Sequence, residues 1–141
     1  MNFLIFMAMK STVEKKVRGY HIDYYGHVNN TRFLEFLEDA RWDFKEKFLN
    51  ITDLHKANIG FITVNINVNF LSPATLGETL EISTSIKEIG NTSIKLEQDI
   101  HSKSGKHILE AIITQVLFDF SRGKPVPIKK YLNVKNSGGK R

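Results

Sequence analysis

The longest periodic pattern in the chain lies in residues 31–50, TRFLEFLEDARWDFKEKFLN. Its large apolar residues recur at helical spacing, as Phe33, Leu37, Ala40, Phe44 and Phe48. Acidic residues occupy the opposite face, so the pattern predicts an amphipathic helix. The apolar face is too wide for a surface helix, and we therefore expect this helix to be the central packing element.

Asparagines mark both ends of the predicted helix. Asn29 or Asn30 is a favourable N-cap, because a short polar side chain accepts a hydrogen bond from a free backbone N–H of the first turn. Asn50 stands where the apolar repeat stops.

Residues 61–71, FITVNINVNFL, follow a different period. Apolar Ile62, Val64, Ile66, Val68 and Phe70 alternate with polar residues, which is the pattern of a β-strand with one polar face. Pro73 ends this run.

Four other runs have the composition of strands. They lie at 12–20, 78–89, 92–102 and 107–120. Turns at Gly90-Asn91 and at residues 103–105 separate the last three, which predicts a meander of antiparallel hairpins. The order of strand, helix and four strands predicts an α+β fold, in which an antiparallel sheet of about five strands wraps around one long helix.

The predicted elements form one domain without internal repeats. We expect residues 1–12 to be a flexible N-terminal lead, residues 13–128 to form the folded domain, and residues 129–141 to be a basic C-terminal tail. At 141 residues the chain is long enough to bury a core.

Composition and charge narrow the classes of function. The chain contains no cysteine, which excludes disulfides, thiolate metal sites and a cysteine nucleophile. Its apolar N-terminus is too short for a membrane span and has no secretory cleavage site. We expect a cytoplasmic protein that does not insert into membranes.

The positive net charge is confined to one end. Residues 122–141 hold seven basic residues and no acid, whereas the other 121 residues hold 13 bases and 15 acids, a formal charge of −2. Nucleic-acid-binding proteins usually spread basic residues over a folded face. We therefore expect no nucleic-acid partner, and a tail that is either solvated or attracts an anionic ligand at long range.

The stretch HIDYYGHVNN, residues 21–30, carries the candidate chemistry. Asp23 lies just before the predicted helix, whose free N–H groups and positive dipole end could stabilise an oxyanion. A carboxylate beside such a donor site suits acyl transfer, since it can act as nucleophile or general base. The alternative is that Asp23 only shapes an Asx turn, in a loop where Gly26 permits tight bending.

The same stretch also reads as HxDxxxH, with His21, Asp23 and His27 as possible metal ligands. No further histidine or carboxylate lies nearby in the sequence to orient them, so we expect no metal. Signatures of serine hydrolases, P-loop proteins and zinc proteases are absent.

The segment RGYHIDYYGHVNNTRFLEFLEDARWDF resembles the D-x-x-G-H-V-N-N-x-x-Y-L-x-x-x-E-x-A-R motif of hotdog-fold acyl-CoA thioesterases of the 4-hydroxybenzoyl-CoA thioesterase type. The similarity extends through TVNINVNFLSPATLGETLEIST, GNTSIKLEQ and EAIITQVLFDF, and it is strongest to the bacterial long-chain acyl-CoA thioesterases linked to β-oxidation. Phe33 departs from the motif, which often has tyrosine there.

The resemblance implies a hotdog fold and a role for each residue of the loop. Asp23 would be the catalytic carboxylate, and backbone N–H groups near His27 and Val28 would polarise the thioester carbonyl. The His27 side chain is either an active-site group or part of the loop scaffold. The expected substrate-binding residues are Tyr25, Gly26, Asn29 and Asn30.

The implied function is hydrolysis of medium- to long-chain acyl-CoA to free acid and coenzyme A, without a cofactor. Two alternatives stay open: a hotdog hydratase or dehydratase using Asp23 and His27, and a non-catalytic acyl-CoA-binding protein. The resemblance also implies a homodimer or a tetramer built as a dimer of dimers. The face of Asn65, Asn67 and Asn69 is either a contact surface or a solvated polar stripe.

Overall fold

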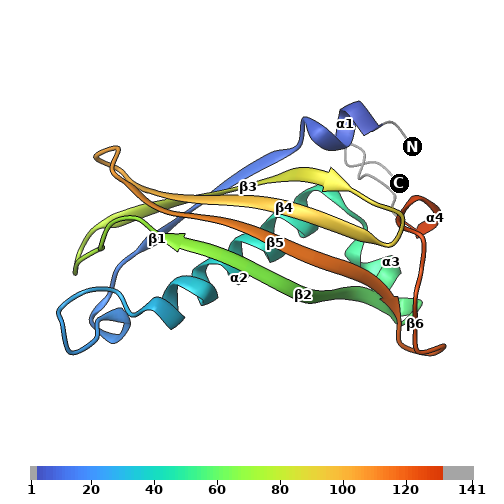
Figure 1. Cartoon of the computed structure of the whole chain (residues 1–141), viewed down its shortest axis with the longest axis horizontal. Coiled ribbons are helices and arrows are strands. Elements are labelled where there is room, and N and C mark those ends of the chain that lie inside the picture. The colour runs from blue at the N-terminus through green and yellow to red at the C-terminus, as the bar shows by residue number, and fades with distance from the viewer. Residues whose placement is uncertain (1–2, 132–141) are drawn as a thin grey trace.

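The computed structural model describes residues 3–131 and shows one curved sheet with a long helix across its concave face (Figure 1). The helices are α1 (Phe3–Met7), α2 (Asn30–Phe48), α3 (Ile51–Lys56) and α4 (Ile128–Tyr131), with a 3₁₀ turn η1 at Gly19–His21. The strands are β1 (Lys10–Lys16), β2 (Ile59–Phe70), β3 (Thr79–Ile89), β4 (Ser93–Ser102), β5 (His107–Asp119) and β6 (Lys124–Pro125).

The sheet is antiparallel and its main strands lie in the order β1-β3-β4-β5-β2, with short β6 pairing with β5. The meander β3-β4-β5 was predicted from the turns at residues 90–91 and 103–105, and it is confirmed. Strand β2 closes the far edge beside β5, although it precedes the meander in sequence. The α+β architecture with one long helix is therefore as predicted.

Helix α2 is the central element that its apolar repeat predicts. Phe33, Leu37, Ala40 and Phe44 are all buried against the sheet, and Asn29 is the N-cap. The interior also holds a polar link, because Gln98 of β4 accepts a hydrogen bond from the Arg41 guanidinium at 3.0 Å. Polar groups buried in such an interior require partners, so this link holds the helix in register over the sheet.

Strand β2 differs from its predicted alternation. A bulge shifts the register between Thr63, which pairs with Gln115, and Asn65, which pairs with Thr114. Because cross-strand partners share a face, Thr63 faces α2 together with buried Gln115, and Ile66 faces α2 after the bulge. The extra residue Val64 is 57% exposed. The predicted face of even-numbered residues therefore points to α2 only after the bulge, and before it the odd-numbered residues do.

The N-terminal segment also differs from the expected flexible lead. It contains α1 and the start of β1, and Phe6 is fully buried in the core. The run at 12–20 predicted a strand that begins and ends later than β1 does. Helix α3 was not predicted. Within the expected basic tail, Lys129 and Lys130 belong to α4, and residues 132–141 lie outside the described part of the chain.

Candidate active site

A short hairpin carries the candidate carboxylate. Ile22 and Val28 form an isolated antiparallel bridge, and the Asp23 N–H donates to the His27 carbonyl at 2.9 Å. This pairing sets Asp23 opposite His27, at the end of the hairpin that leads into α2. The side chain of Asp23 is half-buried, whereas Tyr24 and Tyr25 at the tip are 97% and 80% exposed.

The Asp23 carboxylate shapes its own loop. Its Oδ1 accepts a hydrogen bond from the Tyr25 N–H at 2.9 Å, so Asp23 forms the Asx turn that is the alternative role for this residue. Gly26 closes the turn with a φ of 78°, a conformation that favours glycine. Within the described residues the second carboxylate oxygen has no hydrogen-bond partner. The turn therefore orients the carboxylate while leaving one oxygen available.

His21 is structural and is not positioned as a metal ligand with Asp23 and His27. Its ring is buried, its Nδ1 accepts from the Arg18 N–H at 2.9 Å, and it packs edge-on against Phe36. Burial lowers the pKa of His21, and the nearby charges of Arg32 and Lys15 act in the same direction. These surroundings therefore favour the neutral form of the ring.

The start of α2 provides the donor groups. The Asn29 side chain accepts from the Thr31 N–H at 2.8 Å, which identifies Asn29 rather than Asn30 as the N-cap. The Val28 N–H, expected to polarise a carbonyl, instead donates to the Ala74 carbonyl at 2.8 Å and is not available. Among residues 3–131 neither the His27 nor the Asn30 N–H has an acceptor, so these two donors remain for an oxyanion.

The chemistry of this end of the molecule follows from these groups. A half-buried carboxylate, two unpaired backbone donors and the positive end of a 19-residue helix all belong to one loop and its junction with α2. Donors of this kind can stabilise a developing oxyanion, and a carboxylate so placed can attack a carbonyl carbon or activate water. The His27 side chain is exposed and makes no hydrogen bond to the described residues.

A cavity of about 340 Å³ lies farther along α2, between this helix, α3 and the ends of β2 and β5. Its walls include Arg41, Trp42, Lys45, Phe61, Thr63 and Gln115. Asp23 does not line it. The size lies within the range of small-molecule pockets.

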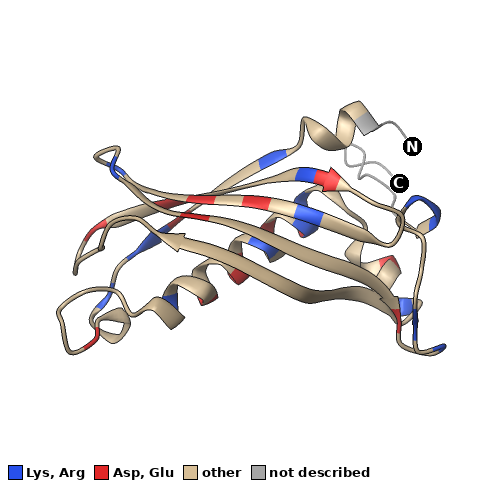
Figure 2. Cartoon of the chain, viewed as in Figure 1, with Lys and Arg blue, Asp and Glu red and all other residues tan. Residues whose placement is uncertain are grey.

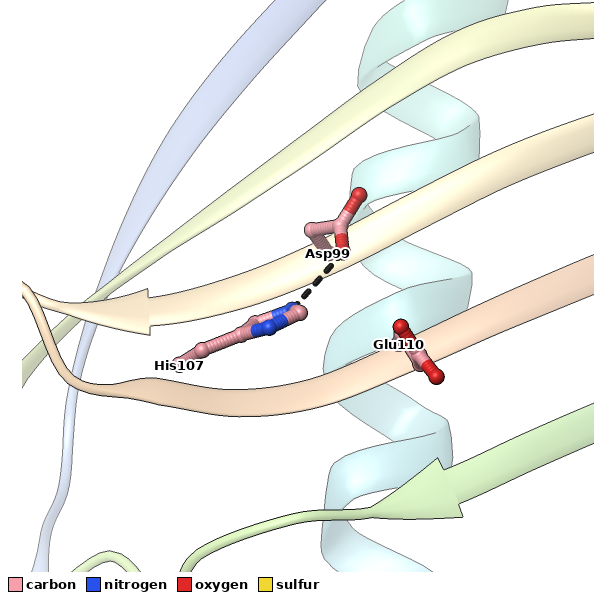
Figure 3. A group of neighbouring side chains, drawn as sticks. All are labelled: Asp99, His107 and Glu110. Carbon is pink, nitrogen blue, oxygen red and sulfur yellow. Dashed lines mark hydrogen bonds and ion pairs between the residues drawn. The ribbon is translucent and has the colours of Figure 1, made fainter.

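Three ionisable side chains meet on the opposite, convex face of the sheet (Figure 3). His107 Nε2 and Asp99 Oδ1 are 2.8 Å apart, and Glu110 lies beside them. One ligand atom from each lies within 4.8 Å of the others, a spacing that would allow a cation. His107 and Asp99 already pair with each other. The group lies on the face of the sheet that points away from α2 and is not part of the loop that carries Asp23.

The polar residues of the cavity were not predicted from the sequence. Lys45 belongs to an amphipathic helix and Gln115 to an apolar strand. In such patterns a single polar residue is usually interpreted as a surface residue. Lys45 could have been identified from its position, because it is a charged residue on the apolar side of the helical repeat. For Gln115 the signal was its place within the apolar run of β5.

Two comparisons of the sequence identify its family. The profile of the thioesterase-like superfamily matches residues 17–134. The long-chain acyl-CoA thioesterase FadM of Escherichia coli (strain K12) is 40% identical over 121 residues, which cover 85% of this chain and 92% of FadM.

Solved structures agree with this assignment. The crystal structure of YbaW from Escherichia coli, described as a probable thioesterase, superposes with a TM-score of 0.77 at 38% identity, covering 86% of this chain and 90% of YbaW. A DHNA-CoA thioesterase from Staphylococcus aureus superposes with a TM-score of 0.80 at 19% identity, covering 86% of this chain and 83% of that one, which supports the fold alone. The chain, with its hotdog fold, therefore belongs to the thioesterase-like superfamily.

Proposed function

We propose that the protein hydrolyses medium- to long-chain fatty acyl-CoA to free acid and coenzyme A. The similarity to FadM supports this substrate class, because it extends over nearly the full length of both chains. The observation that carries the proposal is the position of the half-buried Asp23 carboxylate in the hairpin that leads into α2. We also propose that the reaction takes place in the cytoplasm. Separately, none of the helices within residues 3–131 is long and apolar enough to cross a membrane.

In the proposed reaction the thioester carbonyl oxygen binds to the N–H groups of Asn30 and His27. Asp23 then attacks the carbonyl carbon, or removes a proton from a water molecule that attacks it. The oxyanion of the tetrahedral intermediate is stabilised by the same N–H groups and by the helix dipole. Collapse breaks the carbon–sulfur bond and expels the coenzyme A thiolate. If Asp23 was the nucleophile, water then hydrolyses the resulting anhydride.

We also propose that the working unit contains two copies of the chain paired through β2. One edge of this 12-residue strand has no neighbouring strand among the described residues, and the strand contains no charged residue (Figure 2). Exposed edges usually carry charges or proline that prevent pairing. Val64, Ile66 and Phe70 are instead 57%, 44% and 50% exposed, which favours coverage by a second copy.

This pairing supports a site shared between the copies. Antiparallel pairing sets the first residues of one β2 beside the last residues of the other. The last residue, Phe70, contacts Phe33 in the first turn of α2, with ring centroids 6.0 Å apart, whereas Phe61 and Thr63 line the cavity. The cavity of one copy would therefore open toward the helix start of the other and receive its acyl chain. Two such dimers could associate further into a tetramer.

Release of free thiol from a panel of acyl-CoA esters of increasing length tests the reaction. We expect Asp23→Asn to lower kcat at least about a hundredfold, since a positioned acid–base or nucleophilic group contributes this much or more. Asp53→Asn, which alters an exposed carboxylate on α3, serves as control and should keep full activity. Full turnover by Asp23→Asn would refute the proposed mechanism.

Variants of Asp23 and His27 also distinguish thioester hydrolysis from the alternative reaction, the hydration of enoyl-CoA esters. If the protein hydrates enoyl-CoA esters and His27→Ala loses more activity than Asp23→Ala, a hydratase is the better description. We expect no hydration, and a smaller effect of His27→Ala than of Asp23→Asn on thiol release.

A further inference from the structure

The cavity along α2 has largely apolar walls. Trp42 and Phe61 line it from the helix and from β2, and Ile51, Leu54, Ile59 and Phe120 complete the apolar part. The lining also includes the polar residues Glu38, Arg41, His55 and Asn58. Trp42 remains 50% exposed, although it borders the cavity. Walls of this kind, enclosing about 340 Å³, suit an aliphatic or aromatic body rather than a polar one.

One wall nevertheless contains a buried amine. Lys45 is 7% exposed, and its Nζ lies 4.5 Å from the ring centroid of Phe61 and 5.7 Å from that of Trp42. It forms no ion pair with any described residue, and Glu38, the acid that lines the same cavity, is exposed. Burial is the main cause that lowers the pKa of Lys45 to about 7. The amine therefore lacks the polar partner that buried charges normally have.

The opposite wall contains an unpaired acceptor. Gln115 is 4% exposed, and its Nε2 donates to Thr63 Oγ1 at 2.9 Å. Its Oε1 is buried and has no hydrogen-bond partner among the described residues. Buried polar atoms without partners are rare, and each one needs an explanation, such as a ligand that it binds. The cavity thus presents an unpaired donor and an unpaired acceptor between apolar walls.

We propose that this cavity binds the acyl chain of the substrate, and that Lys45 and Gln115 recognise a hydroxyl group carried by that chain. The inference rests on the proposed function and names its substrate class. A hydroxyl group both donates and accepts hydrogen bonds, so one such group can donate to Gln115 Oε1 and accept from Lys45 Nζ. A carboxylate only accepts and would leave Gln115 Oε1 unpaired. An unsubstituted chain would leave both groups unpaired.

The only tryptophan of the chain provides a direct test, because Trp42 lines the cavity and its fluorescence should respond to a ligand. The probes are the methyl esters of ω-hydroxydodecanoic acid and of dodecanoic acid, which differ only in the hydroxyl group. We expect the hydroxylated ester to bind about tenfold to a hundredfold more tightly, as one charge-assisted hydrogen bond allows. Equal affinity of the two probes for the wild-type protein would overturn the inference.

Matched variants test whether Lys45 and Gln115 cause the preference for the hydroxylated ester. Lys45→Met and Gln115→Leu should each reduce the preference for the hydroxylated ester at least about fivefold. Lys47→Met, which removes an exposed lysine of the same helix, should leave it unchanged. Tightest binding of monomethyl dodecanedioate, whose far end is a carboxylate, would identify an anion site and refute the hydroxyl assignment.

Turnover distinguishes failure of this inference from failure of the proposed function. We expect kcat/KM to be higher for ω-hydroxydodecanoyl-CoA than for dodecanoyl-CoA in the wild type, and the ratio to fall in Lys45→Met. If both esters are hydrolysed equally well, the inference fails and the thioesterase assignment stands. If neither releases thiol, the thioesterase assignment fails, and the Trp42 titration alone decides whether the cavity prefers a hydroxylated chain.

Discussion

The Arg41 guanidinium of α2 donates a 3.0 Å hydrogen bond to the Gln98 Oε1 of β4, and both side chains are buried. The Gln98 Nε2 in turn donates to the Leu37 carbonyl and to Thr84 Oγ1, each at 3.0 Å. One amide therefore connects two turns of the helix with two strands of the sheet.

This connection predicts that removing Gln98 alone destabilises the protein more than removing Gln98 together with Arg41. Gln98→Met removes the hydrogen-bond acceptor of the buried Arg41 guanidinium, and should lower the free energy of unfolding by about 1.5–3 kcal/mol. The double variant Arg41→Met/Gln98→Met should regain part of this loss, because no unpaired charge remains. Urea denaturation of both variants measures the difference. Equal stabilities of the single and the double variant would contradict the prediction.

The second prediction concerns the pH dependence of stability. Because the pKa of Lys45 is lowered from 10.5 to about 7, the folded state binds fewer protons than the unfolded state between these values. The free energy of unfolding of the wild type, relative to Lys45→Met, should therefore rise with pH across this window, by about 3–5 kcal/mol in total. Below pH 7 the variant should be the more stable protein.

Urea midpoints measured at intervals between pH 6 and 10 check this trend. Lys47→Met, altered at an exposed position of the same helix, provides the control and should follow the wild type throughout. A constant difference between wild type and Lys45→Met at all pH values would show that burial does not change the titration of Lys45.

The third prediction concerns the turn that holds Asp23. Gly26 has a φ of 78°, and a Cβ added there meets no atom within 4 Å, so Gly26→Ala tests backbone conformation alone. We expect a loss of about 1 kcal/mol in stability and a larger proportional loss in kcat, because the carboxylate moves.

Gly105 gives a matched comparison, since it has a φ of 96° and equally open surroundings in the turn between β4 and β5. Gly105→Ala should lower stability by a similar amount without changing kcat. Similar activity of the two variants would show that the Asp23 turn tolerates distortion.

The fourth prediction concerns the free edge of β2. Ile66→Lys places a charge on the exposed apolar face near the middle of the strand, and should convert the dimer into a monomer with little activity. Leu76→Lys, at a 65% exposed residue of the loop before β3, should leave both properties unchanged. Light scattering coupled to size exclusion, together with thiol release, measures them. A fully active monomer would refute the two-copy site.

Periodic signals in the sequence predicted most of the fold. The repeat from Phe33 to Phe44 predicted α2 within two residues at its C-terminal end, because helix packing depends on a pattern that is local in sequence. The meander was predicted equally well from its turns. The pairing of β2 with β5 was not predicted, because alternation along a strand carries no information about its partner.

The candidate site was predicted only in part. The motif around Asp23 located the loop, and Asn29 is the N-cap that it suggested. The Val28 N–H was expected to be free, but it is bound to Ala74, which lies 46 positions later in the chain. Long-range contacts of this kind, and the presence of Lys45 and Gln115 in the lining of one cavity, depend on how α2 lies over the sheet.

The extra residue in β2, Val64, also determines how a change of register in this strand would alter the lining of the cavity. Before Val64 the odd-numbered residues of the strand face the helix, and after it the even-numbered residues do. This one residue therefore decides which side chains of β2 line the cavity. If Val64 itself paired with Gln115 and the downstream register were kept, Val64 and Ile62 would turn inward in place of Thr63 and Phe61. The bulge therefore fixes which side chains line the cavity, and deleting the Val64 codon would straighten the ladder to β5 while Phe61 and Thr63 stay inward.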